Sequence, residues 1–244
     1  MNKILLQIFS ALLIFVCVIF GIANSAIKDK KFVCNRYILN TYLYIILTFN
    51  IIALQVLLME YGKVKFNPSM LMFFGIFILS LICVVGINRV SAENMILKHS
   101  VWLVFIGLMS LMFYPMYILY SKQKGLMMSA ILTTLILFFG LSLVAFLRPD
   151  LISLSWGPVL FVILLGGVLT ELVMMFFVTG NKSNMMKYMT YFFIVLFMLY
   201  ILYDTKRLQV NAKKCVKADY VSESFNLFLD IWNLFIRILS VKGN

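Results

Sequence analysis

The sequence YILYDTKRLQVNAKKCVKADYVSESFNLFLDIWNLFIRILSVK, residues 200–242, combines long apolar segments with two aspartates. Asp204 and Asp230 lie inside or at the edge of segments that are apolar enough to enter a membrane. A charged side chain in hydrocarbon costs about 3 kcal/mol or more, so it usually faces the interior of a helix bundle or a water-filled path. These two carboxyl groups are therefore the first candidates for a functional role.

Polar residues recur along one side of the segment 225–241. They are Asn226, Asp230, Asn233 and Arg237. Their steps of four, three and four residues place them on one face of a helix, and the opposite face consists of Leu, Phe, Ile and Trp. We predict a helix with its apolar side toward lipid or neighbouring helices and its polar stripe toward the inside.

The composition of the chain excludes an ordinary soluble domain. The chain has 244 residues, of which 64% are hydrophobic and 12% are charged, with a mean hydropathy of +1.03. Only helices and closed barrels span lipid, and the apolar runs are too long and alternate too weakly for barrel strands. We therefore predict an all-α, polytopic membrane helical bundle without a separate soluble domain.

The chain divides into an N-terminal apolar segment, residues 1–34, and a seven-helix membrane domain, residues 35–244. The first segment is either an extra membrane helix or a signal peptide with Asn24-Ser25-Ala26 as its cleavage site. Its apolar part is longer than is usual in a signal peptide, which favours the helix. The seven predicted helices are Tyr37–Met59, Pro68–Ile87, Val101–Tyr120, Leu126–Leu147, Trp156–Val178, Met185–Tyr203 and Phe225–Val241. The last one is short and interrupted by polar residues, so it either spans the membrane or dips in and returns.

The basic residues lie in short loops beside the apolar spans and give the chain a net charge of +12. In this setting they indicate membrane topology and attraction to lipid head groups, and there is no basic domain to bind nucleic acid. The loop 205–222 is the most basic one, and its side of the membrane carries slightly more than half of the 21 Lys and Arg residues. The positive-inside rule therefore places this loop in the cytosol.

The cysteines and the single histidine form no metal-binding pattern. A reversible lipid on Cys34 or Cys215 remains open, and His99 is expected to be a solvated loop residue. Two membrane aspartates also suggest an intramembrane aspartyl protease, but Asp230 lacks the glycines and the later Pro-Ala-Leu that such enzymes need. We therefore do not expect an enzyme.

Three carboxyl groups, those of Asp204, Asp230 and Glu171, lie in or beside apolar spans. Two carboxylates in one site of low dielectric tend to share a proton, and the deprotonated pair would bind a cation. Calcium prefers oxygen ligands, and Asn226 and Asn233 would add carbonyl oxygens.

A structural role is the alternative for each of these carboxyl groups. Asp204 would be a helix-end residue in water that pairs with Lys206 or Arg207. Asp230 would pair with an arginine, such as Arg237, or make a capped polar contact. Glu171 would make a structural hydrogen bond inside the bundle.

Several short motifs follow one another near the C-terminus. They are Tyr203-Asp204-Thr205 with Leu208, Asp219-Tyr220-Val221, Ser224, Asn226-Leu227 and Leu229-Asp230-Ile231-x-Asn233-Leu234-Phe235. These motifs closely resemble those of the transmembrane Bax-inhibitor-motif family, and in particular its Lifeguard and Golgi anti-apoptotic branch, which includes viral members. A fainter resemblance upstream extends the similarity over about residues 35–240.

This resemblance implies a seven-helix, pH-sensitive calcium leak channel of endoplasmic reticulum or Golgi membranes that suppresses cell death. Asp204 and Asp230 match the two pore aspartates of the family, which would hold calcium transiently, and Asp219 matches an acidic position before the last helix. Calcium is then the transported ion, with no resident cofactor. A non-conducting protein that binds apoptosis-regulating membrane partners is the alternative, and the oligomeric state stays open. The basic latch residue of bacterial relatives has no counterpart before Arg89.

Overall fold

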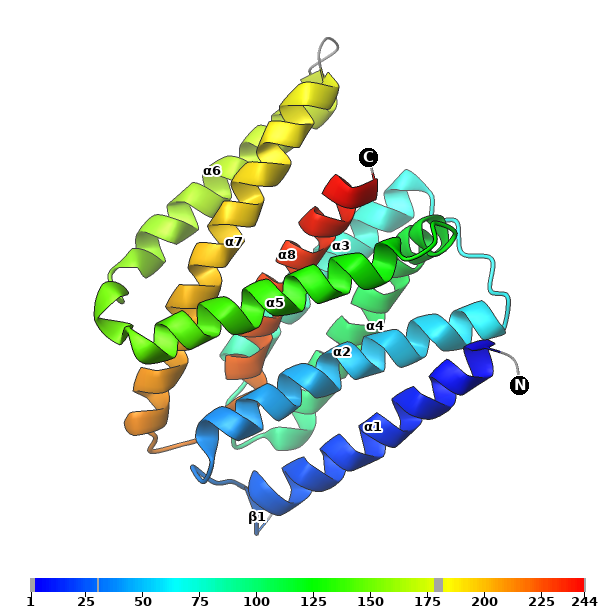
Figure 1. Ribbon diagram of the computed structural model, residues 1–244. Coiled ribbons are helices and arrows are strands. Elements are labelled where there is room, and N and C mark those ends of the chain that lie inside the picture. The colour runs from blue at the N-terminus through cyan, green and yellow to red at the C-terminus, as the bar shows by residue number, and fades with distance from the viewer. Residues whose placement is uncertain (1–2, 30, 178–181, 244) are drawn as a thin grey trace. The chain divides into compact units, whose positions relative to one another are not determined.

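The computed structural model describes residues 3–29, 31–177 and 182–243 (Figure 1). Within these ranges the chain forms eight helices that are long and apolar enough to cross a membrane. The strands of the described part are a single pair of two residues each. The predicted all-α bundle, with seven helices and an extra one at the N-terminus, is confirmed.

The helices are α1 (Lys3–Ser25), α2 (Tyr37–Tyr61), α3 (Met70–Arg89), α4 (Met95–Ser121), α5 (Leu126–Leu147), α6 (Trp156–Phe177), α7 (Lys182–Lys213) and α8 (Tyr220–Gly243). Strands β1 (Ile27–Lys28) and β2 (Lys31–Phe32) form an antiparallel hairpin between α1 and α2. A single 3-10 turn, η1 (Pro149–Leu151), connects α5 to α6.

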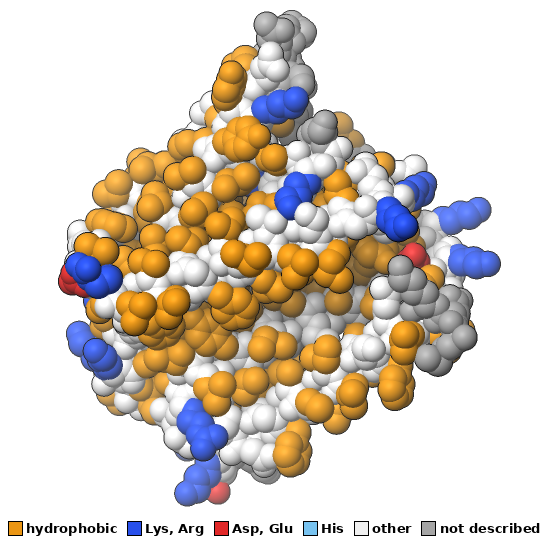
Figure 2. All heavy atoms as spheres, in the orientation of Figure 1, with side chains coloured by type: hydrophobic (Ala, Val, Ile, Leu, Met, Phe, Trp, Pro, Cys, Tyr) orange, Lys and Arg blue, Asp and Glu red, His pale blue; other side chains and the backbone are white. Residues whose placement is uncertain are grey.

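Large apolar side chains cover much of the exposed surface. Figure 2 shows them over most of the face in view, with Lys and Arg mostly toward its margins. Leu71 and Ile136, for example, are 84% and 72% exposed. A soluble protein does not expose such a large apolar surface, whereas in a bilayer these side chains lie against lipid.

Several buried hydroxyl groups within the helices are hydrogen-bonded to their own helix. The hydroxyl groups of Thr48 and Ser110 are buried, and each donates a hydrogen bond to the carbonyl four residues earlier in its own helix. A hydroxyl that is bonded in this way can enter an apolar environment without the cost of an unpaired polar group.

The chain forms two compact units. The first contains residues 1–122 and 214–225, and the second contains residues 123–213 and 226–244. In the first unit α1 lies along α2, and α4 packs against both α2 and α3 (Figure 1). In the second unit α7 packs against α5 and α6. The predicted division after residue 34 stays a prediction.

Three helices differ by more than two residues from their predicted bounds. Helix α8 begins at Tyr220 and not at Phe225. Helix α7 continues from Tyr203 to Lys213, so Asp204 lies within the helix and not at its end. Hydropathy marks only the apolar part of a helix, and the polar part is held by tertiary contacts, such as the hydrogen bond from Gln209 to the Ala145 carbonyl. Helix α4 begins at Met95 and not at Val101, because Asn94 caps its first turn through a hydrogen bond from the Leu97 backbone amide.

Gly167 allows α6 to approach α7 closely. A Cβ atom at this position would lie 2.9 Å from Cε1 of Phe192 and 3.1 Å from Cζ of Phe193. We expect Gly167→Val to lower the free energy of unfolding in detergent by about 1–3 kcal/mol, because both rings would have to move.

Gly166→Val is the matched control. It adds the same side chain one residue earlier, where a Cβ atom would have no described atom within 4 Å. Equal losses of stability for the two variants would show that the ring contacts do not determine this helix packing.

Candidate functional site

Asp204 of α7 and Asp230 of α8 come together in the second unit. The two carboxyl groups lie within hydrogen-bonding reach of each other, and the side chains are buried. Two ionised carboxylates have only acceptors, so a hydrogen bond between them requires a shared proton. Among the described residues, Oδ1 of Asp204 and Oδ2 of Asp230 have no hydrogen-bond partner. The structure thus brings together two buried carboxyl groups, each with one oxygen that has no described hydrogen-bond partner. Their role in an ion path stays a prediction.

Arg207 adds a positive charge beside this aspartate pair. Its Nη1 lies 3.3 Å from Oδ1 of Asp204, one helical turn away on α7. The pairing that was predicted as an alternative is therefore present, although Asp204 is buried and not in water. With one shared proton, the two carboxyl groups and the guanidinium are together neutral.

The predicted amide ligands lie on the same helix as Asp230. Asn226 precedes it by one turn and is half-buried, and Nδ2 of Asn233 donates a 2.8 Å hydrogen bond to the Leu229 carbonyl. In the described part of the chain, neither amide is hydrogen-bonded to the aspartate pair. Their role as ion ligands stays a prediction.

A hydroxyl pair next to Asp204 escaped the sequence reasoning. The side-chain oxygens of Thr205 and Ser142 are 3.4 Å apart and both residues are buried, which joins α7 to α5. The position of Thr205 directly after Asp204 was visible in the sequence, but its partner 63 residues away was not.

Glu171 and Arg237 form a bidentate ion pair. Nη1 and Nη2 of Arg237 lie 2.5 and 2.6 Å from the two carboxylate oxygens of Glu171. The guanidinium also lies over the ring of Phe193, 4.3 Å from its centroid. These contacts connect α6, α7 and α8, and they match the structural alternative for Glu171. Its role in an ion path stays a prediction.

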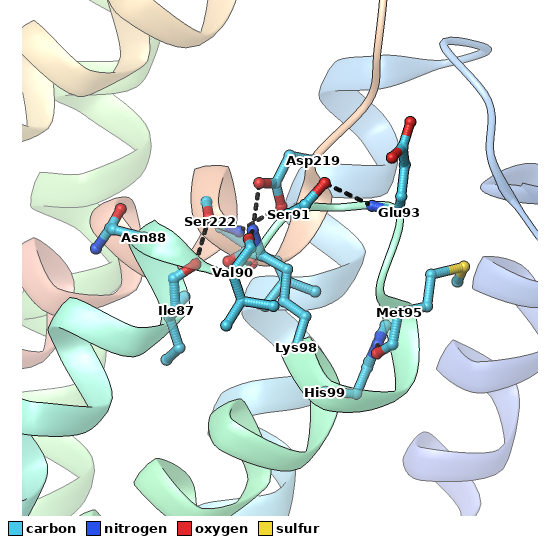
Figure 3. Close-up of polar contacts among 12 residues, drawn as sticks. Ile87, Asn88, Val90, Ser91, Glu93, Met95, Lys98, His99, Asp219 and Ser222 are labelled. Carbon is cyan, nitrogen blue, oxygen red and sulfur yellow. Dashed lines mark hydrogen bonds and ion pairs between the residues drawn. The ribbon is translucent and has the colours of Figure 1, made fainter.

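The first unit contains a second ionic site, at the start of α8. Nζ of Lys98 forms an ion pair with Asp219 and donates a 3.0 Å hydrogen bond to the Val90 carbonyl, although Lys98 is only 1% exposed (Figure 3). The other carboxylate oxygen of Asp219 accepts a 3.1 Å hydrogen bond from the Ser222 backbone amide. Asp219 thus caps α8 and balances the charge of a buried lysine. A supporting role of Asp219 in an ion path stays a prediction.

Contacts around this site tie several helix ends together. The Ser222 hydroxyl donates a 3.2 Å hydrogen bond to the Ile87 carbonyl near the end of α3 (Figure 3). Lys217 lies 2.8 Å from the Glu93 carboxylate, and this hydrogen bond lowers the pKa of Glu93. The sequence reasoning missed Lys98 because it placed residue 98 in a loop; the Asn94 cap was the signal for a helix there.

The expectation of a solvated His99 is wrong. His99 lies on α4, and its Nδ1 donates a 2.7 Å hydrogen bond to the Met95 carbonyl. Its Nε2 is 3.0 Å from the Tyr44 hydroxyl, and the rings of Phe32 and Trp102 lie beside it. The earlier start of α4 brings the imidazole into this aromatic cluster.

Cys34 and Cys215 form a disulfide bond, with their Cα atoms 5.9 Å apart. Both sulfur atoms are occupied, so the lipid attachment that the sequence left open does not apply to this state. The partners are 181 positions apart in the chain, which is why spacing could not reveal them. Cys17 and Cys83 are free thiols.

The comparison with protein families decides the classification. A family model described as "Inhibitor of apoptosis-promoting Bax1" matches residues 34–244. This chain belongs to the Bax inhibitor family. The match includes α2 to α8 and therefore both Asp204 and Asp230, whereas α1 lies outside it. No curated protein and no solved structure matched the chain.

Membership in the Bax inhibitor family confirms the resemblance that the C-terminal motifs indicated. Together with the eight apolar helices, it makes the chain a multi-pass integral membrane protein of an anti-apoptotic family. The assignment to the Lifeguard branch and a viral origin stay predictions.

Proposed function

We propose that this Bax inhibitor family member is a pH-sensitive calcium leak channel of intracellular membranes, in the endoplasmic reticulum or the Golgi. It lowers stored calcium and thereby suppresses apoptosis. The observation that carries the proposal is the buried pair of Asp204 and Asp230, whose carboxyl groups lie next to each other. A buried ionisable group in a membrane helix is expensive and usually serves transport.

Protons and calcium compete for the aspartate pair in this mechanism. With one shared proton, the pair and Arg207 are neutral, so a divalent cation gains little from binding. Loss of the proton leaves two carboxylates against one guanidinium, and the net negative charge attracts calcium to hard oxygen ligands. Acidification therefore reduces calcium occupancy and changes the flux.

Calcium efflux from liposomes that contain the purified protein tests this proposal, scanned from about pH 5 to pH 8. We expect a pH-dependent transition that Asp204→Asn and Asp230→Asn each shift and that the double variant lacks, because asparagine cannot exchange a proton. Asp150→Asn is the matched control, since Asp150 is exposed and its carboxylate pairs with Arg148 in the η1 turn, outside the helices that could cross a membrane.

The folded state of each variant is checked by size-exclusion chromatography in detergent. Unchanged flux and unchanged pH dependence in a folded double variant would refute the role of the pair. Folded wild-type protein without any calcium flux would instead favour the non-conducting alternative, in which the protein acts by binding partners.

A further inference from the structure

We propose that the end of the first unit that carries the Cys34–Cys215 disulfide faces the non-cytosolic, oxidising side of the membrane. Disulfides form and persist in the lumen of the endoplasmic reticulum, outside the cell or in the periplasm, whereas cytosolic thiols are kept reduced. The bond is thus a covalent modification that reports on the orientation of the whole chain.

The number of helices between the two cysteines agrees with one shared side. Six helices, α2 to α7, separate Cys34 from Cys215, and each is long and apolar enough to cross a membrane. An even number of crossings returns the chain to the side where it started. If one of these helices failed to cross, the two cysteines would lie on opposite sides and could not form a bond.

Hydrogen bonds place several helix ends beside the disulfide. The Tyr220 hydroxyl contacts the Val33 carbonyl and lies 3.2 Å from the Asn35 carbonyl, next to Cys34 in the chain. The Ser222 hydroxyl donates to the Ile87 carbonyl at the end of α3. The start of α2, the end of α3 and the start of α8 therefore share one side of the membrane.

This orientation is the reverse of the one that the positive charges predict. The prediction relied on five basic residues in a presumed loop, residues 205–222. Three of them, Lys206, Arg207 and Lys213, lie in α7, and the connection 214–219 retains two. These residues follow the apolar part of α7 and still count as residues beside a span. The difference between the two sides is small, 12 Lys and Arg against 9, so the charge rule opposes the disulfide only weakly.

The orientation assigns sides to the polar features of the first unit. The Lys98–Asp219 site lies at the oxidising side, because Asp219 follows Cys215 without an intervening helix. The connection 62–69 lies in the cytosol, one crossing away from Cys34. This inference does not depend on calcium conduction, so failure of either proposal leaves the other intact.

The first test traps the thiol state in cells. The full chain with Cys17→Ala and Cys83→Ala is expressed, and the cells are lysed in denaturant with N-ethylmaleimide. We expect no free thiol before reduction and two thiols that react with a polyethylene-glycol maleimide after reduction. A further Cys34→Ser variant provides the reference with one free thiol, at Cys215. Free thiols at both cysteines without reduction would overturn the proposal.

The second test determines which side of the membrane the connections before and after α3 face. It uses single reporter cysteines in these two connections. Ser91→Cys and Lys65→Cys are introduced separately into the Cys17→Ala, Cys83→Ala chain, which retains the disulfide; both positions are exposed. A membrane-impermeant maleimide is added to sealed vesicles whose outer face is cytosolic. We expect Lys65→Cys to react at once and Ser91→Cys only after detergent is added. The reverse pattern would overturn the proposed orientation.

Discussion

Replacement of Asp219 by alanine is expected to lower the free energy of unfolding by about 3–5 kcal/mol, because removal of one partner leaves a buried charge without compensation. Lys98 is 1% exposed, and without Asp219 its ammonium would keep only the Val90 carbonyl as a described partner. The substitution also removes the acceptor that caps α8 at Ser222. Equilibrium unfolding in mixed detergent measures the loss.

Two variants separate the charge effect from the cap. Lys98→Met combined with Asp219→Asn removes both charges and keeps a capping acceptor, so it should recover most of the lost stability. Lys98→Met alone should lower the free energy of unfolding less than Asp219→Ala does, since Asp219 is 29% exposed and water can solvate its carboxylate. If the double variant is as unstable as Asp219→Ala, the buried charge is not the cause.

Arg237→Ala is expected to lower the free energy of unfolding by about 3 kcal/mol, because it leaves the Glu171 carboxylate unpaired in a mostly buried position. The variant also loses the contact of the guanidinium with the Phe193 ring. Arg237→Lys should fall between wild type and alanine, since a lysine keeps the charge but not the two parallel hydrogen bonds. Thermal unfolding in detergent ranks the three proteins.

The pair of Glu171→Gln and Arg237→Met in one chain is the control, and it should be more stable than Arg237→Ala. The same double variant also decides the role of Glu171. A structural pair predicts that the pH transition of calcium efflux is unchanged, whereas a shift of that transition would place Glu171 in the ion path.

Local signals in the sequence were sufficient to predict the bounds of a helix where the helix and its apolar segment have the same ends. The prediction for α5, Leu126–Leu147, agrees with the structure at both ends. Gly125 precedes this helix with a φ of 80°, a conformation that favours glycine, and the polar turn at Arg148 follows it. Such signals lie within a few residues of the boundary, so the sequence displays them directly.

Long-range contacts were beyond the sequence reasoning. Asp204 and Asp230 could be selected because a carboxylate in an apolar segment is costly wherever its partner lies. In contrast, the fold determines which residues pair with each other. Glu171 pairs with Arg237, Asp219 with Lys98 and Cys215 with Cys34. Each of these pairs joins residues at least 66 positions apart, and local periodicity carries no information at that distance.

The distance along the chain between Cys34 and Cys215 has a consequence for biogenesis. At roughly 5–20 residues per second, the ribosome needs about 10–35 s to synthesise the intervening segment. In the proposed orientation Cys34 is an unpaired thiol on the oxidising side throughout that time, while six helices still have to insert. Its native bond can close only when nearly the entire protein has been made, so Cys34 is open to exchange with other thiols until Cys215 emerges.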